Sequence, residues 1–129
     1  MAVKIIYFVH GTTTDNINHK STGWLHGKLS EKGIEQSIRL REQIDLNEID
    51  LVISSDLKRA IDSAKYTFKD SKVILHDKRI RECNYGDLNG ENTTLALEVI
   101  TKNISWKEAI DNDWRKTKNW QPGWRYEIR

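Results

Sequence analysis

Short apolar runs alternate with amphipathic stretches through the first part of the chain. The run from Val3 to Val9 is almost continuously apolar, which predicts a strand buried on both faces. Two further apolar runs, Leu51–Ile53 and Lys72–His76, predict short buried strands. Residues 30–44 and 57–68, which lie between these runs, carry apolar side chains at helical spacing. The order strand, helix, strand, helix, strand predicts an α/β fold with a parallel sheet and right-handed crossovers.

Both predicted helices have recognisable starts. Ser30 is expected to cap the first helix, and Ser55 or Asp56 is expected to cap the second. The apolar positions of the first helix are Ile34, Ile38, Leu40 and Ile44, and those of the second are Leu57, Ala60, Ile61, Ala64 and Phe68. A long polar loop from His10 to about Leu29 precedes the first helix, and loops of this length in compact domains are usually functional or disordered.

Composition narrows the class of protein. The 129 residues fit a single domain, residues 1–129, with one core. No apolar run is long enough to span a bilayer, so no membrane partner is expected, and a net charge of +2 is too small to indicate nucleic-acid binding by itself. Cys83 is the only cysteine, so the sequence excludes an intrachain disulfide, argues against a zinc cluster and favours a reducing, cytoplasmic setting.

Candidate chemistry follows the predicted strands. Ligands of parallel sheets bind beyond the carboxyl ends of the strands, where His10, the segment 54–56 and the pair Arg81 and Glu82 are expected to meet. The His10 imidazole could attack phosphorus, while Gly11 and the loop amides would let an anion approach. The simpler alternative is a histidine that ends a strand and caps a loop.

Arg59 and Glu82 also allow two interpretations each. Arg59 lies in the first turn of the second helix, where its guanidinium and the free helix N–H groups could bind one anion; alternatively it is a solvated surface arginine. A phosphate beside Glu82 would raise the pKa of its carboxyl, so that Glu82 could protonate a leaving oxygen. The alternative is a structural ion pair between Glu82 and Arg79 or Arg81.

Four motifs in order resemble the histidine phosphatase superfamily, which includes the phosphoglycerate mutases. They are His10-Gly11-Thr12-Thr13-x-x-Asn16, Leu29-Ser30-x-x-Gly33-x-x-Gln36, Ser54-Ser55-Asp56-Leu57-Lys58-Arg59-Ala60 and Arg81-Glu82-x-x-Tyr85-Gly86-x-x-x-Gly90. The resemblance implies a three-layer sandwich with a mostly parallel sheet. It implies a phosphatase for small phosphorylated substrates, with His10 as the nucleophile that forms phosphohistidine and Glu82 as the general acid. Arg59 and Asn16 would bind the phosphate, with Gly11, Thr12 and Thr13 around it, and neither a metal nor an organic cofactor is expected.

The chain departs from the family pattern in two ways. Val9 stands where the family has an arginine, which removes one guanidinium from the phosphate site. The late family strand with a second histidine is missing, and a substitute role for His19, His26 or His76 is not favoured. The chain therefore resembles an internally shortened member, joined near residues 92–94. The first and second strands could pair directly, a second chain could fill the gap in a homodimer, or the fold could be marginally stable. A rearranged three- or four-stranded sheet is favoured.

The C-terminal part predicts two helices, over residues 95–103 and from a capping box at Ser105–Glu108 onward. Trp114 to Trp120 interleaves aromatic and basic residues, which could stack on single-stranded nucleic acid. Nearby acidic residues dilute the positive charge, so packing of the tryptophans over the core is favoured and no nucleic-acid partner is expected. Three functions remain: a phosphatase, a non-catalytic relative that binds a phosphorylated ligand or partner, and a nucleic-acid-binding module.

Overall fold

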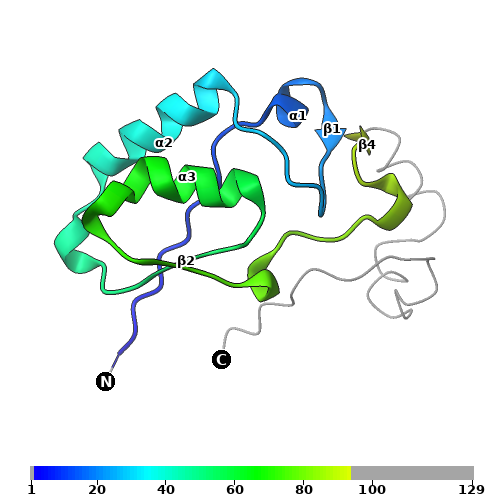
Figure 1. Ribbon diagram of the computed structural model, residues 1–129. Helices are drawn as coiled ribbons and strands as arrows, with labels where there is room; N and C mark the ends of the chain where they lie inside the picture. Colours follow the sequence, from blue (N-terminus) through cyan, green and yellow to red (C-terminus); the bar gives the residue numbers. More distant parts are fainter. Residues whose placement is uncertain (1, 94–129) are drawn as a thin grey trace.

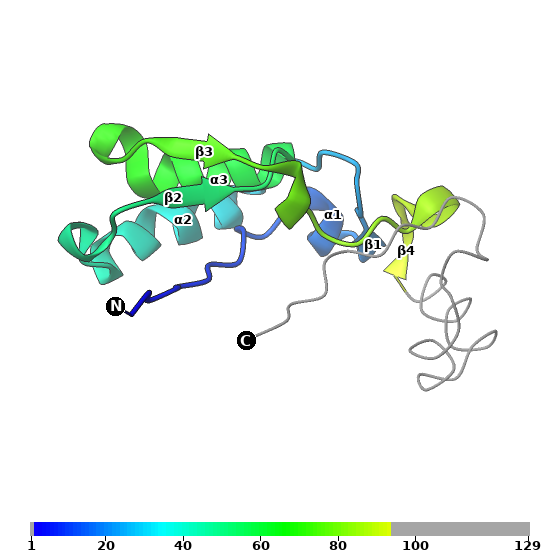
Figure 2. The same cartoon turned by 90° about the horizontal axis from the view of Figure 1, so that it is seen from below.

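A computed structural model of the chain describes residues 2–93 (Figure 1). Its centre is a parallel pair of strands, β2 (Val52–Ser54) and β3 (Ile74–His76), with Val52 opposite Ile74 and Ser54 opposite His76. Helices α2 (Glu31–Gln43) and α3 (Lys58–Phe68) lie side by side against one face of this pair (Figure 2). The predicted β-α-β unit and the α/β class are therefore confirmed. One helical layer covers the sheet in the described residues, so the three-layer sandwich is not seen in this part of the chain.

The core lies between α3 and β2, and it confirms the predicted apolar side of α3. Val52, Ala64 and Phe68 are buried together, and Leu57 is buried just before the helix. The prediction for α2 was less accurate, because Ile38 is exposed and the buried positions of this helix are Gly33 and Ser37. Helix α2 packs through these small residues because its backbone approaches its neighbours closely, and the buried Thr67 hydroxyl of α3 donates to the Ser37 carbonyl at 3.0 Å.

The two helices begin differently. Ser30 caps α2 as predicted, accepting a hydrogen bond from the Gly33 amide at 3.1 Å. The prediction that Ser55 or Asp56 caps α3 was wrong, since the N-cap residue is Leu57 and it makes no side-chain cap. The Asp56 carboxylate is occupied by a bidentate pair with Arg81, which explains why it does not bond to the helix amides.

The N-terminal segment is the main correction to the predicted fold. Residues 2–12 form neither helix nor strand, so the predicted buried strand Val3–Val9 is absent. The odd-numbered side chains Val3, Ile5, Tyr7 and Val9 are 65–88% exposed, whereas Phe8 packs edge-on against Phe68 with ring centroids 6.3 Å apart. Apolar side chains make a stable strand only when a pairing neighbour and a covering layer are present, and β2 pairs with β3 instead. The expected direct pairing of the first two strands, and with it a three- or four-stranded sheet, is not formed within residues 2–93.

The predicted loop from His10 to Leu29 contains regular structure. It holds α1 (Thr14–Ile17) and β1 (Lys20–Ser21), and β1 pairs antiparallel with β4 (Glu91–Asn92). The described strands thus form one parallel and one antiparallel pair, not the mostly parallel sheet that was expected. Short 3-10 turns complete the described elements: Leu46–Glu48, Lys69–Ser71, Lys78–Ile80 and Gly86–Leu88.

The helices predicted over residues 95–103 and beyond Ser105, and the tryptophan-rich tail, lie outside the described residues. Among the helices of residues 2–93, none combines the length and the apolar character that a membrane span requires.

Candidate active site

The backbone after His10 is held by both helices. The Gly11 amide donates to Ser63 Oγ at 2.9 Å, and Ser63 Oγ donates to the Arg59 carbonyl at 2.7 Å. Ser63 and Arg59 both belong to α3, so this chain of hydrogen bonds places the segment at His10 next to the first turns of that helix. The position of His10 is therefore set by α3, although the segment before it is not a strand.

The start of α2 holds the same segment from the other side. Gln36 Oε1 accepts hydrogen bonds from the Thr12 amide at 2.9 Å and from its hydroxyl at 3.0 Å. The Thr12 carbonyl accepts from the Ser30 amide at 2.9 Å and from the Ser30 hydroxyl at 2.8 Å. Gly11 crosses Gly33 so closely that a Cβ on Gly11 would lie 2.3 Å from the Gly33 carbonyl oxygen. The motif at the start of α2 thus serves to fix the backbone that carries His10.

Thr13 and Asn16 form the capping box of α1. The Asn16 amide donates to Thr13 Oγ1 at 3.0 Å, and the Thr13 amide donates to Asn16 Oδ1 at 2.9 Å. Thr13 is fully buried. These oxygens are therefore engaged within the loop, and the phosphate contacts expected of Gly11, Thr12, Thr13 and Asn16 remain predictions.

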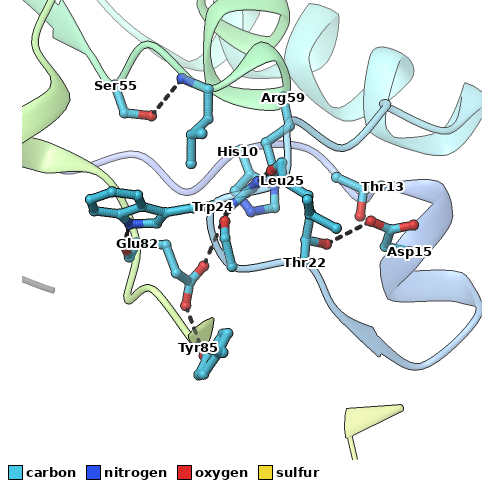
Figure 3. Close-up of polar contacts among 12 residues, drawn as sticks. His10, Thr13, Asp15, Thr22, Trp24, Leu25, Ser55, Arg59, Glu82 and Tyr85 are labelled. Atoms are coloured by element: carbon cyan, nitrogen blue, oxygen red, sulfur yellow. Dashed lines mark hydrogen bonds and ion pairs between the residues drawn. The ribbon is translucent and has the colours of Figure 1, made fainter. Parts of the chain in front are cut away.

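His10 is half-buried, and a contact with its neighbour defines its tautomer. Its Nδ1 lies 2.7 Å from the Gly11 carbonyl oxygen. Because a carbonyl oxygen only accepts, Nδ1 carries a hydrogen in this contact, and in the neutral imidazole the lone pair is then on Nε2. In the view of Figure 3, the His10 ring overlaps Arg59 and Leu25.

Arg59 is buried, so the interpretation as a solvated surface arginine was wrong. It is 2% exposed, and its guanidinium donates from Nη1 to the Leu25 carbonyl at 2.7 Å and from Nη2 to the Gly23 carbonyl at 2.8 Å. Burial lowers the pKa of Arg59, and the nearby charges of Glu82 and Asp15 act in the opposite direction. An arginine retains its charge under such shifts, so the site contains a buried positive charge.

Glu82 faces Arg59. Its Oε2 lies 3.8 Å from Arg59 Nη2, and its Oε1 accepts from the Tyr85 hydroxyl at 3.3 Å (Figure 3). Burial, followed by the charge of Glu82, raises the pKa of Tyr85 to about 12, so this phenol stays a donor. The alternative pairing of Glu82 with Arg79 or Arg81 was wrong, because those arginines bind Asp77 and Asp56.

His26 and His76 make other contacts. The His26 carbonyl accepts from the Arg59 amide at 3.2 Å, and His76 Nδ1 lies 2.8 Å from Ser54 Oγ. Val9 is exposed and supplies no donor. Within residues 2–93, no group of histidine, cysteine and acidic side chains is arranged to hold a metal ion.

Sequence reasoning missed two residues that hold the site together, Ser63 and Trp24. Ser63 lies on the α3 face next to the apolar stripe, and a small hydroxyl residue there gives little signal. Trp24 is a large aromatic residue in an otherwise polar loop, and this pattern could have indicated a structural role at the site. Its Nε1 donates to the Glu82 carbonyl at 2.8 Å, and its ring lies 4.8 Å from the Arg81 guanidinium.

Comparison with known proteins agrees with the motifs. The sequence profile of the histidine phosphatase superfamily (branch 1) matches residues 6–127, and the chain belongs to this family. It is 30% identical over 109 residues to a glucosyl-3-phosphoglycerate phosphatase of Mycobacterium tuberculosis, covering 83% of this chain and 49% of the relative. It is 35% identical over 116 residues to a 2,3-bisphosphoglycerate-dependent phosphoglycerate mutase of Staphylococcus aureus, covering 84% and 51%. The chain thus spans about half the length of the curated relatives it matches.

Solved structures show the same likeness. A phosphoglycerate mutase from Bacillus anthracis superposes with a TM-score of 0.65 at 33% identity, over 72% of this chain and 43% of that protein. A mycobacterial glucosyl-3-phosphoglycerate phosphatase in complex with VO3 superposes with a TM-score of 0.64 at 29% identity, over 88% and 53%. At family level, the relatives are phosphatases and mutases.

Proposed function

We propose that this chain is a phosphomonoesterase of the histidine phosphatase type, which acts on small phosphorylated substrates through a phosphohistidine intermediate. His10 is the nucleophile, Arg59 binds the transferring phosphoryl group and Glu82 is the general acid. The single cysteine, Cys83, supports a reducing, cytoplasmic setting.

The reaction has two steps. His10 Nε2 attacks phosphorus, the phosphorus–oxygen ester bond breaks, and the leaving alkoxide takes the proton of the Glu82 carboxyl. Water then attacks the phosphohistidine, the phosphorus–nitrogen bond breaks, and Glu82 takes a proton from that water. Inorganic phosphate and free His10 result, and Glu82 again carries its proton.

The observation that carries the proposal is the arrangement around Arg59. Its guanidinium lies 3.8 Å from the Glu82 carboxylate. Its main-chain carbonyl accepts from Ser63 Oγ, which in turn accepts from the amide of Gly11, the residue after His10. Phosphoryl transfer depends mostly on positioning and on stabilisation of charge, and a nucleophile, a cation and an acid are the three groups it uses here. Val9 contributes no cation, and the absence of one preorganised donor typically costs about 10²–10³ in rate.

A second candidate, binding of a phosphorylated ligand without turnover, is favoured by two observations. Val9 offers no donor, and two N–H groups of Arg59 are already occupied by the Leu25 and Gly23 carbonyls. Both features reduce stabilisation of the transition state of phosphoryl transfer more than they reduce the affinity for a bound phosphate.

The test compares wild type with His10→Ala and with His19→Asn, a matched histidine control. Phosphate release is measured from glycerol 2-phosphate, 3-phosphoglycerate and p-nitrophenyl phosphate, and intact mass spectrometry after an alkaline quench detects the phosphorylated protein. We expect turnover and phosphorylation in wild type and His19→Asn, and neither in His10→Ala. Equal background turnover in all three proteins would refute the phosphatase. Calorimetric binding of 3-phosphoglycerate that Arg59→Ala abolishes would then support the binding protein.

A further inference from the structure

The direct contacts of the Glu82 carboxylate are too long to fix it alone. The Arg59–Glu82 distance of 3.8 Å exceeds the roughly 2.7–2.9 Å of a charge-assisted hydrogen bond, and the Tyr85 contact is 3.3 Å. The Glu82 side chain is 47% exposed. A general acid must nevertheless be aligned with the leaving oxygen, so other contacts must place Glu82.

Trp24 connects Glu82 to Arg59. Its indole N–H donates to the Glu82 carbonyl at 2.8 Å, and the carbonyl of the preceding residue, Gly23, accepts from Arg59 Nη2 at 2.8 Å. Asn89 Oδ1 holds both the Trp24 amide, at 3.2 Å, and the Tyr85 amide, at 3.1 Å. Trp24 thus links the main chain at Gly23, which binds Arg59, to the main chain at Glu82.

The indole ring is itself fixed from the start of α3. The Arg81 guanidinium lies 4.8 Å from the ring centroid and binds the Asp56 carboxylate through two hydrogen bonds of 2.5 Å. Asp56 precedes Arg59 by three residues. The Asp56–Arg81 pair therefore links the start of α3 to the Trp24 ring, whose N–H binds the Glu82 carbonyl.

We propose that Trp24 is a positioning residue for Glu82, which aligns this carboxyl with the leaving group through its indole N–H while Asp56 and Arg81 fix the ring. The inference rests on the proposed role of Glu82. Trp24 combines an aromatic face on Arg81 with a ring N–H that reaches the Glu82 carbonyl, whereas phenylalanine would keep the stacking on Arg81 and lose the donor.

The first measurement uses leaving groups of different basicity. Glycerol 2-phosphate needs a proton on its departing oxygen, whereas p-nitrophenolate leaves without one. We expect Trp24→Phe to lower kcat/KM for glycerol 2-phosphate, which reports the transfer to His10, by about five- to tenfold, the size of one hydrogen bond. The kcat/KM for p-nitrophenyl phosphate should stay within about twofold, whereas kcat also reflects the second step, in which Glu82 is the base for both substrates. In a Glu82→Gln background, Trp24→Phe should have no further effect, and Tyr66→Phe serves as the control that removes an exposed aromatic donor.

A loss of equal size in kcat/KM on both substrates would overturn the inference, because it would indicate a general structural role for Trp24. If wild type hydrolyses neither substrate, the proposed function fails, and amide hydrogen exchange decides the inference separately. Trp24→Phe should then speed exchange of the Tyr85 amide at least about fivefold without changing exchange in α3. An unchanged Tyr85 amide would overturn the positioning role.

Discussion

The backbone crossing between Gly11 and Gly33 offers a sharp test of how His10 is held. In Gly11→Ala, the new Cβ would lie 2.3 Å from the Gly33 carbonyl oxygen, 2.8 Å from its carbonyl carbon and 2.9 Å from its Cα. All three atoms are backbone atoms, so no side chain can rotate out of the way. Gly11 does not have a positive φ, so the effect is steric and not conformational.

The size of the effect follows from what must move. Separating the two backbones shifts Gly11 away from Ser63 and shifts Thr12 away from Ser30 and Gln36. Overpacking alone typically costs about 1–3 kcal/mol, and each weakened hydrogen bond adds about 0.5–1.5 kcal/mol. We therefore expect Gly11→Ala to lower the free energy of unfolding by about 3 kcal/mol.

Urea unfolding followed by circular dichroism measures this loss, with Glu35→Ala on the exposed face of α2 as the control. Glu35 makes one exposed pair with Arg39, so the control should change the free energy of unfolding by less than about 0.5 kcal/mol. Phosphate release measured where both proteins are folded should also fall in Gly11→Ala, because His10 moves relative to Arg59. A change of less than about 0.5 kcal/mol in Gly11→Ala would refute the tight crossing.

Three further predictions concern separate parts of the molecule. Arg59→Lys should destabilise the fold by at least about 2 kcal/mol in urea unfolding, because the single nitrogen of lysine does not reproduce the two-nitrogen fork that donates to the Leu25 and Gly23 carbonyls; a loss under about 0.5 kcal/mol would contradict this. Tyr85 should ionise at about pH 12 in an ultraviolet titration, with that step missing in Tyr85→Phe. Its folded-state pKa is raised above the ordinary 10.0, so its contribution to stability is complete below pH 10 and declines as the pH rises toward 12; ionisation near pH 10 would disprove this. The exposed apolar side chains of residues 3–9 favour a homodimer, so light scattering should show a concentration-dependent mass that Ile5→Ser reduces, and a single-chain mass at all concentrations would contradict it.

Local patterns predicted the helices well because their causes lie close together in the sequence. The apolar stripe of α3 repeats every three to four residues, and Ser30 caps α2 through an amide three residues away. The cap of α3 could not be predicted in the same way. Asp56 binds Arg81, which lies 25 residues further along the chain, and therefore does not cap the helix. The Val3–Val9 segment has strand-forming side chains, but a strand also needs a pairing neighbour, which is a property of distant parts of the chain.

The predicted meeting of His10, the segment 54–56 and the pair Arg81 and Glu82 shows how a site prediction can depend on a fold prediction. It relied on three parallel strands ending at one edge of a sheet, yet the segment before His10 is not a strand. The residues after His10 are held instead by Ser63 of α3 and by Gln36 near the start of α2. The backbone position of the segment that carries His10 is therefore encoded in the residues after it.

The contacts made by the residues after His10 affect how the motifs should be interpreted. In the segment from Gly11 to Asn16, the hydrogen bonds of Thr12, Thr13 and Asn16 all go to backbone or to neighbouring side chains. Substituting them would lower activity by moving His10, even if none of them touched a phosphate. A loss of activity in such a variant therefore does not show phosphate binding. The two roles separate in the affinity for inorganic phosphate. A direct contact sets this affinity, whereas displacement of His10, the proposed nucleophile, changes it much less than it changes kcat.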